Sequence, residues 1–141
     1  MRYRVVAVGR MKDAALRAAC DEYLDRLRHY ARVEEREVKD EARILGAIPD
    51  GSRLVALSRR GEEWTSGQLA DWTGRWEMDS RDIVFAIGGA DSLPGVVLRQ
   101  AERLWSLSHL TFPHEVARVI LYEQLYRAHT IRRGEPYHRG G

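Results

Sequence analysis

The stretch DIVFAIGG, Asp82 to Gly89, decides how this chain folds. The apolar run inside it, Ile83–Ile87, does not alternate with polar residues, which is typical of a parallel strand covered on both faces. We therefore expect a central strand from Asp82 to Ile87. Two glycines follow its carboxyl end, where backbone without a side chain can approach a ligand closely.

Strand and helix patterns alternate on both sides of this stretch. Short β-branched or apolar runs predict further strands at Tyr3–Val8, Val33–Val38, Arg53–Leu57 and Trp105–Leu110. Apolar residues spaced by three and four predict helices over Lys12–Tyr30, from Ser66 to a close at Asp79, over Gly95–Leu104 and over His114–Arg132, with Gly61–Thr65 as a loop and Asp40–Ile48 undecided. Because the connections are too long for hairpins, we expect one α/β domain, residues 1–141, with a mostly parallel sheet flanked by helices.

Three loops lie beyond the ends of the expected strands, where α/β folds bind ligands: after Leu57, after Ile87, and around Leu107–Phe112. The glycine pair in the second loop is a weak signal alone, because glycine pairs often only turn the chain. The sequence contains no G-x-G-x-x-G, no P-loop and no G-x-S-x-G motif. The residue pattern therefore predicts where a ligand binds, without saying which ligand.

Composition favours a soluble globular protein. Hydrophobic residues make up 44% and charged residues 31% of the chain, unlike a disordered protein. Apolar runs such as Val5–Val8 are far too short to span a bilayer, and no apolar signal-peptide core follows Arg2 and Arg4. We expect a cytoplasmic protein that does not enter a membrane.

Cysteine and histidine usage gives no sign of a metal. Cys20 is the only cysteine and lies in a helical pattern, as expected for a small buried residue. The spacing of the five histidines matches no metal signature. We therefore expect no metal site.

The end of the chain is locally basic, although the net charge is only +2. Between Arg118 and Arg139 five arginines face only two acids, Glu123 and Glu135. This density suits a phosphate-rich partner, but charge alone equally describes a solvated tail. The last helix is apolar on more than one face, so it either lies centrally in the core or is shared with a second subunit.

Two long segments resemble a known family. They are IGGADSLPG, residues 87–95, and WSLSHLTFPHEVARVILYEQLYRAHTIRRGEPYHR, residues 105–139. Both resemble the bacterial 23S rRNA pseudouridine N3-methyltransferases, members of the SPOUT class. The opening RYRVVAVGRMK, residues 2–12, also resembles the first strand of that family. The resemblance covers nearly the whole chain and is densest in its last third.

The resemblance implies an α/β fold whose C-terminal part is tied in a trefoil knot, an exception to the rule that chains do not thread loops. It also implies S-adenosylmethionine (SAM) bound in the knot and a homodimer formed largely through the last helix. Carried onto this sequence, the adenosyl pocket falls on Leu57, Gly88, Leu107, Ser108, His109, Leu110, Thr111 and Phe112. Ser92 stands where the family commonly has a third glycine, which puts ligand contacts by Asp91 and Ser92 in doubt.

The resemblance places the tail beside the SAM site of the partner subunit. N3 of a neutral pseudouridine carries a proton, so some group must accept it or stabilise the anion. His138 is the candidate proton acceptor or base orienter, Arg127 and Arg139 are candidates to hold RNA phosphate or base oxygens, and Tyr137 is a candidate to pack on the base. RNA binding without a chemical role is the alternative for each of them.

The implied function is SAM-dependent methylation of N3 of a pseudouridine in 23S ribosomal RNA, in the free RNA or in the ribosome. Two alternatives remain at this point. One is a SPOUT methyltransferase that acts on transfer RNA through the same pocket. The other is an RNA-binding dimer without catalysis that assists ribosome assembly, against which the intact PYHR tail argues.

Overall fold

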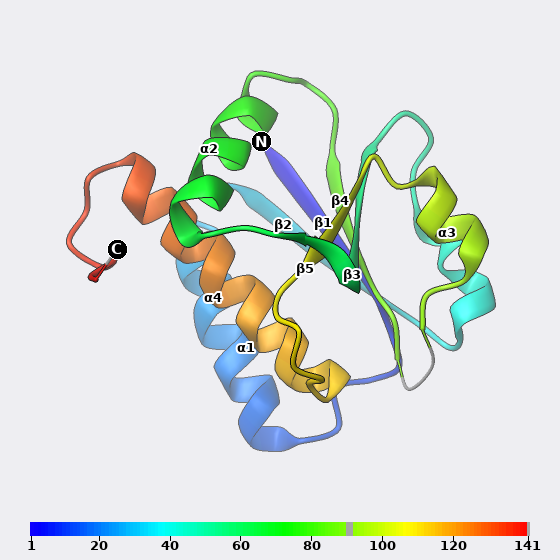
Figure 1. Ribbon diagram of the computed structural model, residues 1–141. Helices are drawn as coiled ribbons and strands as arrows, with labels where there is room; N and C mark the ends of the chain where they lie inside the picture. The colour runs from blue at the N-terminus through cyan, green and yellow to red at the C-terminus, as the bar shows by residue number, and fades with distance from the viewer. Residues whose placement is uncertain (90–91, 141) are drawn as a thin grey trace.

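A computed structural model describes residues 1–89 and 92–140 and contains a five-stranded sheet in which every pair is parallel (Figure 1). The strand order is β2-β1-β4-β3-β5. The strands are β1 Arg2–Val8, β2 Arg32–Val38, β3 Arg53–Glu63, β4 Ile83–Ile87 and β5 Arg103–Ser106. The predicted α/β class and parallel sheet are confirmed, and the trefoil knot stays a prediction.

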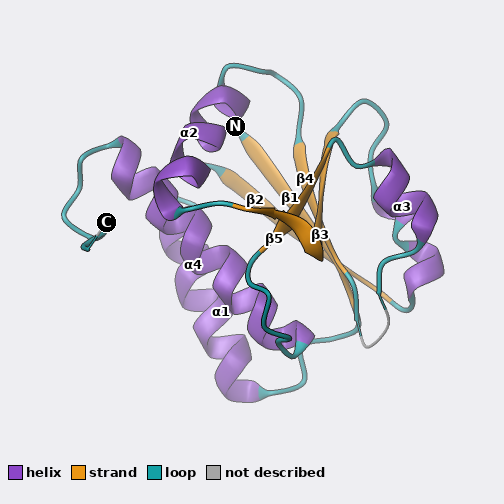
Figure 2. Cartoon of the chain, in the orientation of Figure 1, coloured by secondary structure: helices purple, strands orange, loops and turns teal. Residues whose placement is uncertain are grey.

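Helices cover both faces of the sheet (Figure 2). One face carries α1 Ala14–Leu27, α2 Ser66–Glu77 and α4 His114–Arg132, and the other carries α3 Gly95–Gln100 with two 3-10 turns, Glu41–Arg43 and Leu45–Ala47. Local sequence explains where two of these helices begin or end. The Asp13 side chain accepts a hydrogen bond from the Leu16 N–H and so caps the start of α1. Gly134, with φ of 65°, takes the left-handed conformation just beyond α4.

The core consists of two apolar clusters, one on each face of the sheet. Tyr3, Phe85 and Leu121 belong to the cluster under α1, α2 and α4. Val84 and Val97 belong to the cluster under α3. Every residue of β4 is buried, as the unbroken run Ile83–Ile87 predicts for a central strand.

Strand β3 is longer than predicted, and the expected loop at Gly61–Thr65 is wrong for its first three residues. A side chain on Gly61 would place its Cβ 2.4 Å from the backbone carbon and oxygen of Leu104. The glycine is therefore present because two strands approach closely there, not because the chain turns.

The predicted border between the third helix, Gly95–Leu104, and the last strand is also wrong. Helix α3 ends at Gln100, and β5 begins two residues before the expected Trp105 and ends at Ser106. The Ser106 hydroxyl donates to the Ser108 carbonyl at 3.0 Å, which bends the chain out of the strand. The undecided segment Asp40–Ile48 contains only the two 3-10 turns.

Candidate functional site

A cavity of ≈ 640 Å³ lies beyond the carboxyl ends of β3, β4 and β5, at the edge where parallel sheets bind ligands. Its size is within the range of small-molecule sites. The structure brings all eight residues predicted for the adenosyl pocket to this cavity: Leu57, Gly88, Leu107, Ser108, His109, Leu110, Thr111 and Phe112. The three loops singled out from the sequence therefore converge on one place.

The loop after β5 forms one wall and has both apolar and polar surfaces. Leu107 and Phe112 are half-buried, whereas Leu110 is 70% exposed at the rim. The Ser108 hydroxyl accepts a hydrogen bond from the Leu110 N–H at 3.0 Å, so this amide is not available to a ligand. The wall therefore presents apolar side chains, and hydrogen bonds made by Ser106 and Ser108 fix the conformation of the loop that carries them.

The glycines after β4 form the floor of the cavity. A Cβ on Gly89 would lie 3.0 Å from Cγ1 of Val8 and 3.2 Å from Oε1 of Glu41, so even a methyl group fits poorly. Ser92 also lines the cavity, and Asp91 lies outside the described residues. This floor brings bare backbone to the cavity, as the sequence predicts for Gly88 and Gly89.

The start of α4 forms another wall through His114 and Ala117, and a buried charge holds it in place. Arg118 is 1% exposed; its guanidinium donates to the Glu37 carboxylate at 2.6 Å and to the Gly9 carbonyl at 3.2 Å. A buried guanidinium must be paired in this way. Sequence reasoning missed this anchor, because Arg118 was counted with the basic end of the chain.

The tail folds back on the second half of α4. The Glu123 carboxylate accepts from the Arg127 guanidinium at 2.6 Å and from the Tyr137 hydroxyl at 2.8 Å. The Arg127 guanidinium lies over the Tyr137 ring, 4.7 Å from its centroid, and donates to Nδ1 of His138 at 3.1 Å. We call Glu123, Arg127, Tyr137 and His138 the tail cluster. Three of the four were predicted site residues, and Glu123, which links them, was missed.

The protonation of the tail cluster follows from its contacts. Burial and the hydrogen bond to Glu123 raise the pKa of the Tyr137 phenol well above its usual range, so this residue remains a proton donor. Guanidinium nitrogens only donate, so Nδ1 of His138 is the acceptor in its contact with Arg127. A neutral His138 ring in this arrangement carries its proton on Nε2.

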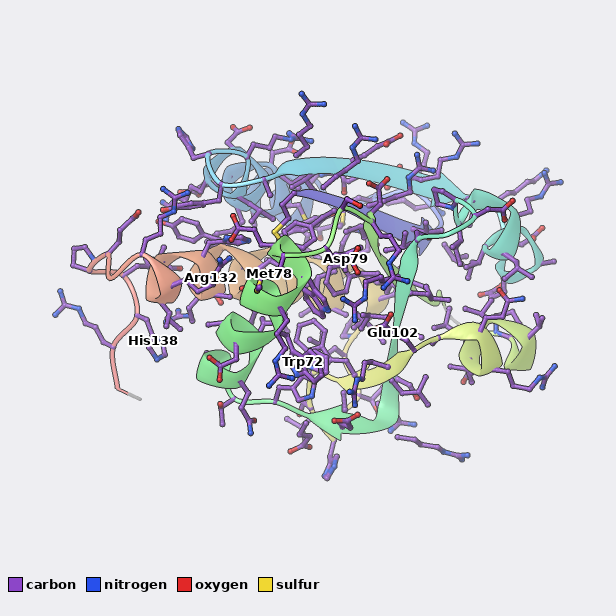
Figure 3. All side chains as sticks on the ribbon, turned by 90° about the horizontal axis from the view of Figure 1, so that it is seen from above. Trp72, Met78, Asp79, Glu102, Arg132 and His138 are labelled. Atoms are coloured by element: carbon purple, nitrogen blue, oxygen red, sulfur yellow. The ribbon has the colours of Figure 1, made fainter. Side chains whose placement is uncertain are left out.

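The cavity and the tail cluster lie at different ends of α4. Ala117 lines the cavity and Arg127 belongs to the tail cluster, and ten residues of helix separate them by about 15 Å. Figure 3 shows His138 on the tail beyond Arg132, away from the sheet. The structure gathers the predicted donor pocket in one place and the predicted acceptor residues in another, with Arg139 exposed on the tail.

Comparisons with known proteins agree with this fold. Residues 1–138 match the family described as predicted SPOUT methyltransferase. Proteins named ribosomal RNA large subunit methyltransferase H, from Burkholderia mallei strain SAVP1 and Burkholderia pseudomallei strain K96243, are each 41% identical to this chain, over 99% of both chains. The chain belongs to the SPOUT methyltransferase family.

A solved structure shares the fold at much lower identity. It is a probable methylase family protein from Haemophilus influenzae Rd KW20, with a TM-score of 0.62 and 9% identity over 98% of this chain and 70% of that chain. The fold of this SPOUT methyltransferase therefore rests on structural as well as sequence likeness.

The basic end of this SPOUT methyltransferase is less charged than its sequence suggests. Arg118 is buried, Arg127 pairs with Glu123, and Arg132 pairs with Glu77. In the described part of the chain, only Arg133 and Arg139 of this segment have no ion pair. The charge count alone was a poor guide to a phosphate-binding surface.

Residues 1–89 and 92–140 contain neither a cluster of metal ligands nor a helix that could span a membrane. Within them no group of three or more His, Cys, Asp or Glu side chains is placed to hold a metal ion. No helix in this part of the chain is both long and apolar enough to cross a bilayer.

Proposed function

We propose that this SPOUT methyltransferase transfers a methyl group from SAM to N3 of a pseudouridine in 23S ribosomal RNA, and that it acts as a homodimer. The observation that carries the proposal is the cavity beyond the strand ends, built by the residues expected to bind SAM, in a chain 41% identical to proteins named ribosomal RNA large subunit methyltransferase H. A ribosomal substrate places the protein in the cytoplasm.

The cavity residues suit SAM. Leu57, Leu107 and Phe112 offer apolar surface for the two faces of an adenine ring, while loop backbone between Leu107 and Phe112 supplies donors and acceptors for its edge. Gly88 and Gly89 line the cavity without side chains, so their backbone can approach the ribose or methionine part closely. When bound, SAM supplies a methyl group that its sulfonium already activates, so the protein mainly aligns the reactants.

The outer face of α4 supports the dimer. Val116, Ile120, Glu123 and Arg127 follow one another at intervals of four, three and four residues, which puts them on one stripe of the helix opposite the core residue Leu125. Val116 and Ile120 are half-buried and belong to neither core cluster. A second copy packed antiparallel on this stripe covers them.

The same packing unites the two halves of the site. In an antiparallel α4 pair centred near Tyr122, Arg127 of each copy lies at the level of the other copy's Ala117, which lines the cavity. The tail cluster of one copy, which is far from its own cavity, then lies beside the cavity of the other copy. Each dimer then contains two composite sites.

The tail cluster acts on the acceptor base by orientation and charge. The Nε2–H of His138 donates to a base oxygen, and the Arg127 and Arg139 guanidinium groups stabilise the negative charge that develops when N3 releases its proton to solvent water. The Glu123 carboxylate already accepts hydrogen bonds from Arg127 and Tyr137. Of the two roles expected for His138, the contacts favour base orienter over proton acceptor.

The deciding experiment is transfer of labelled methyl from SAM to ribosomes that lack the modification, with the product nucleoside identified by mass spectrometry. We expect label on N3-methylpseudouridine. SAM binding without label in ribosomal RNA contradicts the substrate, and transfer RNA is then the next acceptor to assay.

A further inference from the structure

Two arginines stand on the rim of the cavity because β3 bulges there. The pairing of β3 with β5 shifts register between Leu57 and Glu62, so the residues between them leave the ladder. Gly61 closes the bulge by its close approach to Leu104. Bulges of this kind re-aim side chains beside active sites, and this one presents Arg59 and Arg60 at the cavity.

The bulge is held by polar contacts. The Ser58 hydroxyl accepts from the Arg60 N–H at 3.3 Å, and the Arg59 guanidinium donates to the Thr111 hydroxyl at 2.7 Å. Thr111 belongs to the loop that forms the cavity wall. Arg59 is thus fixed to the site by a neutral partner, which leaves its charge uncompensated.

The charges around the bulge are unevenly paired. Glu62 pairs with Arg103 at 3.1 Å, and Glu63 pairs with His109 at 2.8 Å. By contrast, Arg59 and Arg60 are exposed and have no carboxylate partner among residues 1–89 and 92–140. Among the described residues that line the cavity, Arg59 and Arg60 are the only ones with a formal charge, and no Asp or Glu lies beside them in the lining. The rim at the bulge is therefore locally positive.

We propose that Arg59 and Arg60 bind the RNA backbone phosphates that flank the target nucleotide, a role that rests on the proposed function. A base that enters a pocket leaves its own phosphates at the mouth, where these two side chains are exposed. Guanidinium groups match the planar, two-oxygen geometry of phosphate. The rim therefore sets affinity for the RNA, whereas the cavity walls bind SAM.

The test is the double variant Arg59→Gln/Arg60→Gln, assayed on ribosomes that lack the modification. The matched control is Arg36→Gln/Lys39→Gln, which removes the same charge from β2 and its end, at the opposite edge of the sheet. KM for ribosomes, its salt dependence, kcat, and the Kd for SAM by calorimetry are measured for both and for the wild type.

We expect the rim variant to raise KM for ribosomes at least about tenfold, since charge-assisted contacts are strong. The slope of log KM against log salt should fall by about two, one per phosphate contact. Kd for SAM should stay within about twofold, and the control should match the wild type.

Three results overturn the proposal. A weaker Kd for SAM with unchanged KM assigns the arginines to the SAM carboxylate. Equal losses in the control and rim variants indicate general attraction rather than a contact. Unchanged constants exclude any role. If the wild type methylates no ribosomal RNA, the proposed function itself is wrong. The wild-type assay alone shows this, so it is not confused with a failure of the arginine proposal, which only the variants reveal.

Discussion

The two ends of α4 differ in what they offer a ligand. Its first turn borders an open cavity, with His114 and Ala117 in the wall and no described carboxylate in the lining. Its last turns carry the tail cluster, in which Arg127, Tyr137 and His138 already contact one another or Glu123. The first turn borders a cavity that can bind a ligand, whereas the other end carries hydrogen-bonding and charged groups that can orient a base. The difference supports the proposal that each chain contributes two half-sites to the dimer.

The largest effect is expected from separating the copies. Ile120→Asp puts a charge in the middle of the proposed α4 stripe, so the dimer should dissociate and methyl transfer should fall to background. Sedimentation and labelled-methyl transfer measure the two effects. Met78→Asp, at a position that is 91% exposed, is the control and should leave both unchanged. A monomeric Ile120→Asp variant with full activity would show that one chain suffices.

Next in size is the loss of the His138 ring. His138→Ala should lower kcat roughly 100-fold and leave the Kd for SAM unchanged, because the proposed partner of the His138 ring is the acceptor base and not SAM. His138→Gln keeps an N–H donor and should recover part of the rate if the ring orients the base. Equal rates for the two variants would instead favour proton transfer by His138.

A smaller effect is expected at the cavity end. Gly89→Ala forces Val8 or the glycine backbone to move by a few tenths of an ångström, which should weaken SAM binding about fivefold by calorimetry. Gly74→Ala is the control, since its Cβ would meet only Arg132 at an ordinary 3.5 Å. Tight SAM binding by Gly89→Ala would mean that the floor does not touch the ligand.

The last prediction has no effect at neutral pH and concerns how the free energy of unfolding depends on pH through His129, near the end of α4. His129 is 4% exposed and its Nε2 is 2.8 Å from the Tyr3 hydroxyl. Burial, with help from Arg132, lowers the pKa of His129 from 6.5 to about 4. The unfolded chain binds a proton first as the pH falls, so about 3 kcal/mol of unfolding free energy should be lost between pH 6.5 and 4, with no loss at pH 7.

Denaturant titrations across this pH range measure the loss. His129→Gln, which does not titrate, is the comparison and should flatten the part of the pH dependence that His129 causes. An unchanged slope in that variant would assign the acid sensitivity to other groups.

Much of this arrangement could be predicted from particular residues. The run Ile83–Ile87 and the glycines after it predict the central strand and the floor of the cavity. The loop Leu107–Phe112 was placed correctly, because apolar loops at strand ends converge in parallel sheets. Local pattern failed where tertiary contact overrides it, as at Gly61, a glycine needed for close strand approach.

Other features depend on contacts that no local pattern shows. The pairing of Arg118 with Glu37 joins residues 81 apart in the sequence, so the arginine could only be read as part of a basic segment. The link from Tyr137 to Glu123 crosses a helix end. The identity of the ligand and of the acceptor came from family resemblance alone. The basic end and the apolar faces of the last helix allowed an RNA partner and a dimer, but they equally allowed a solvated tail and a central core helix.

The most direct test of the two half-sites is complementation between two inactive chains. His138→Ala keeps an intact cavity, and Leu107→Trp fills the cavity but keeps an intact tail; the two are co-expressed with different tags and mixed dimers are purified. Such a dimer should bind one SAM and contain one complete site, and we expect about half of the wild-type rate. Mixed dimers that bind one SAM yet remain as inactive as either parent would contradict a site shared between subunits.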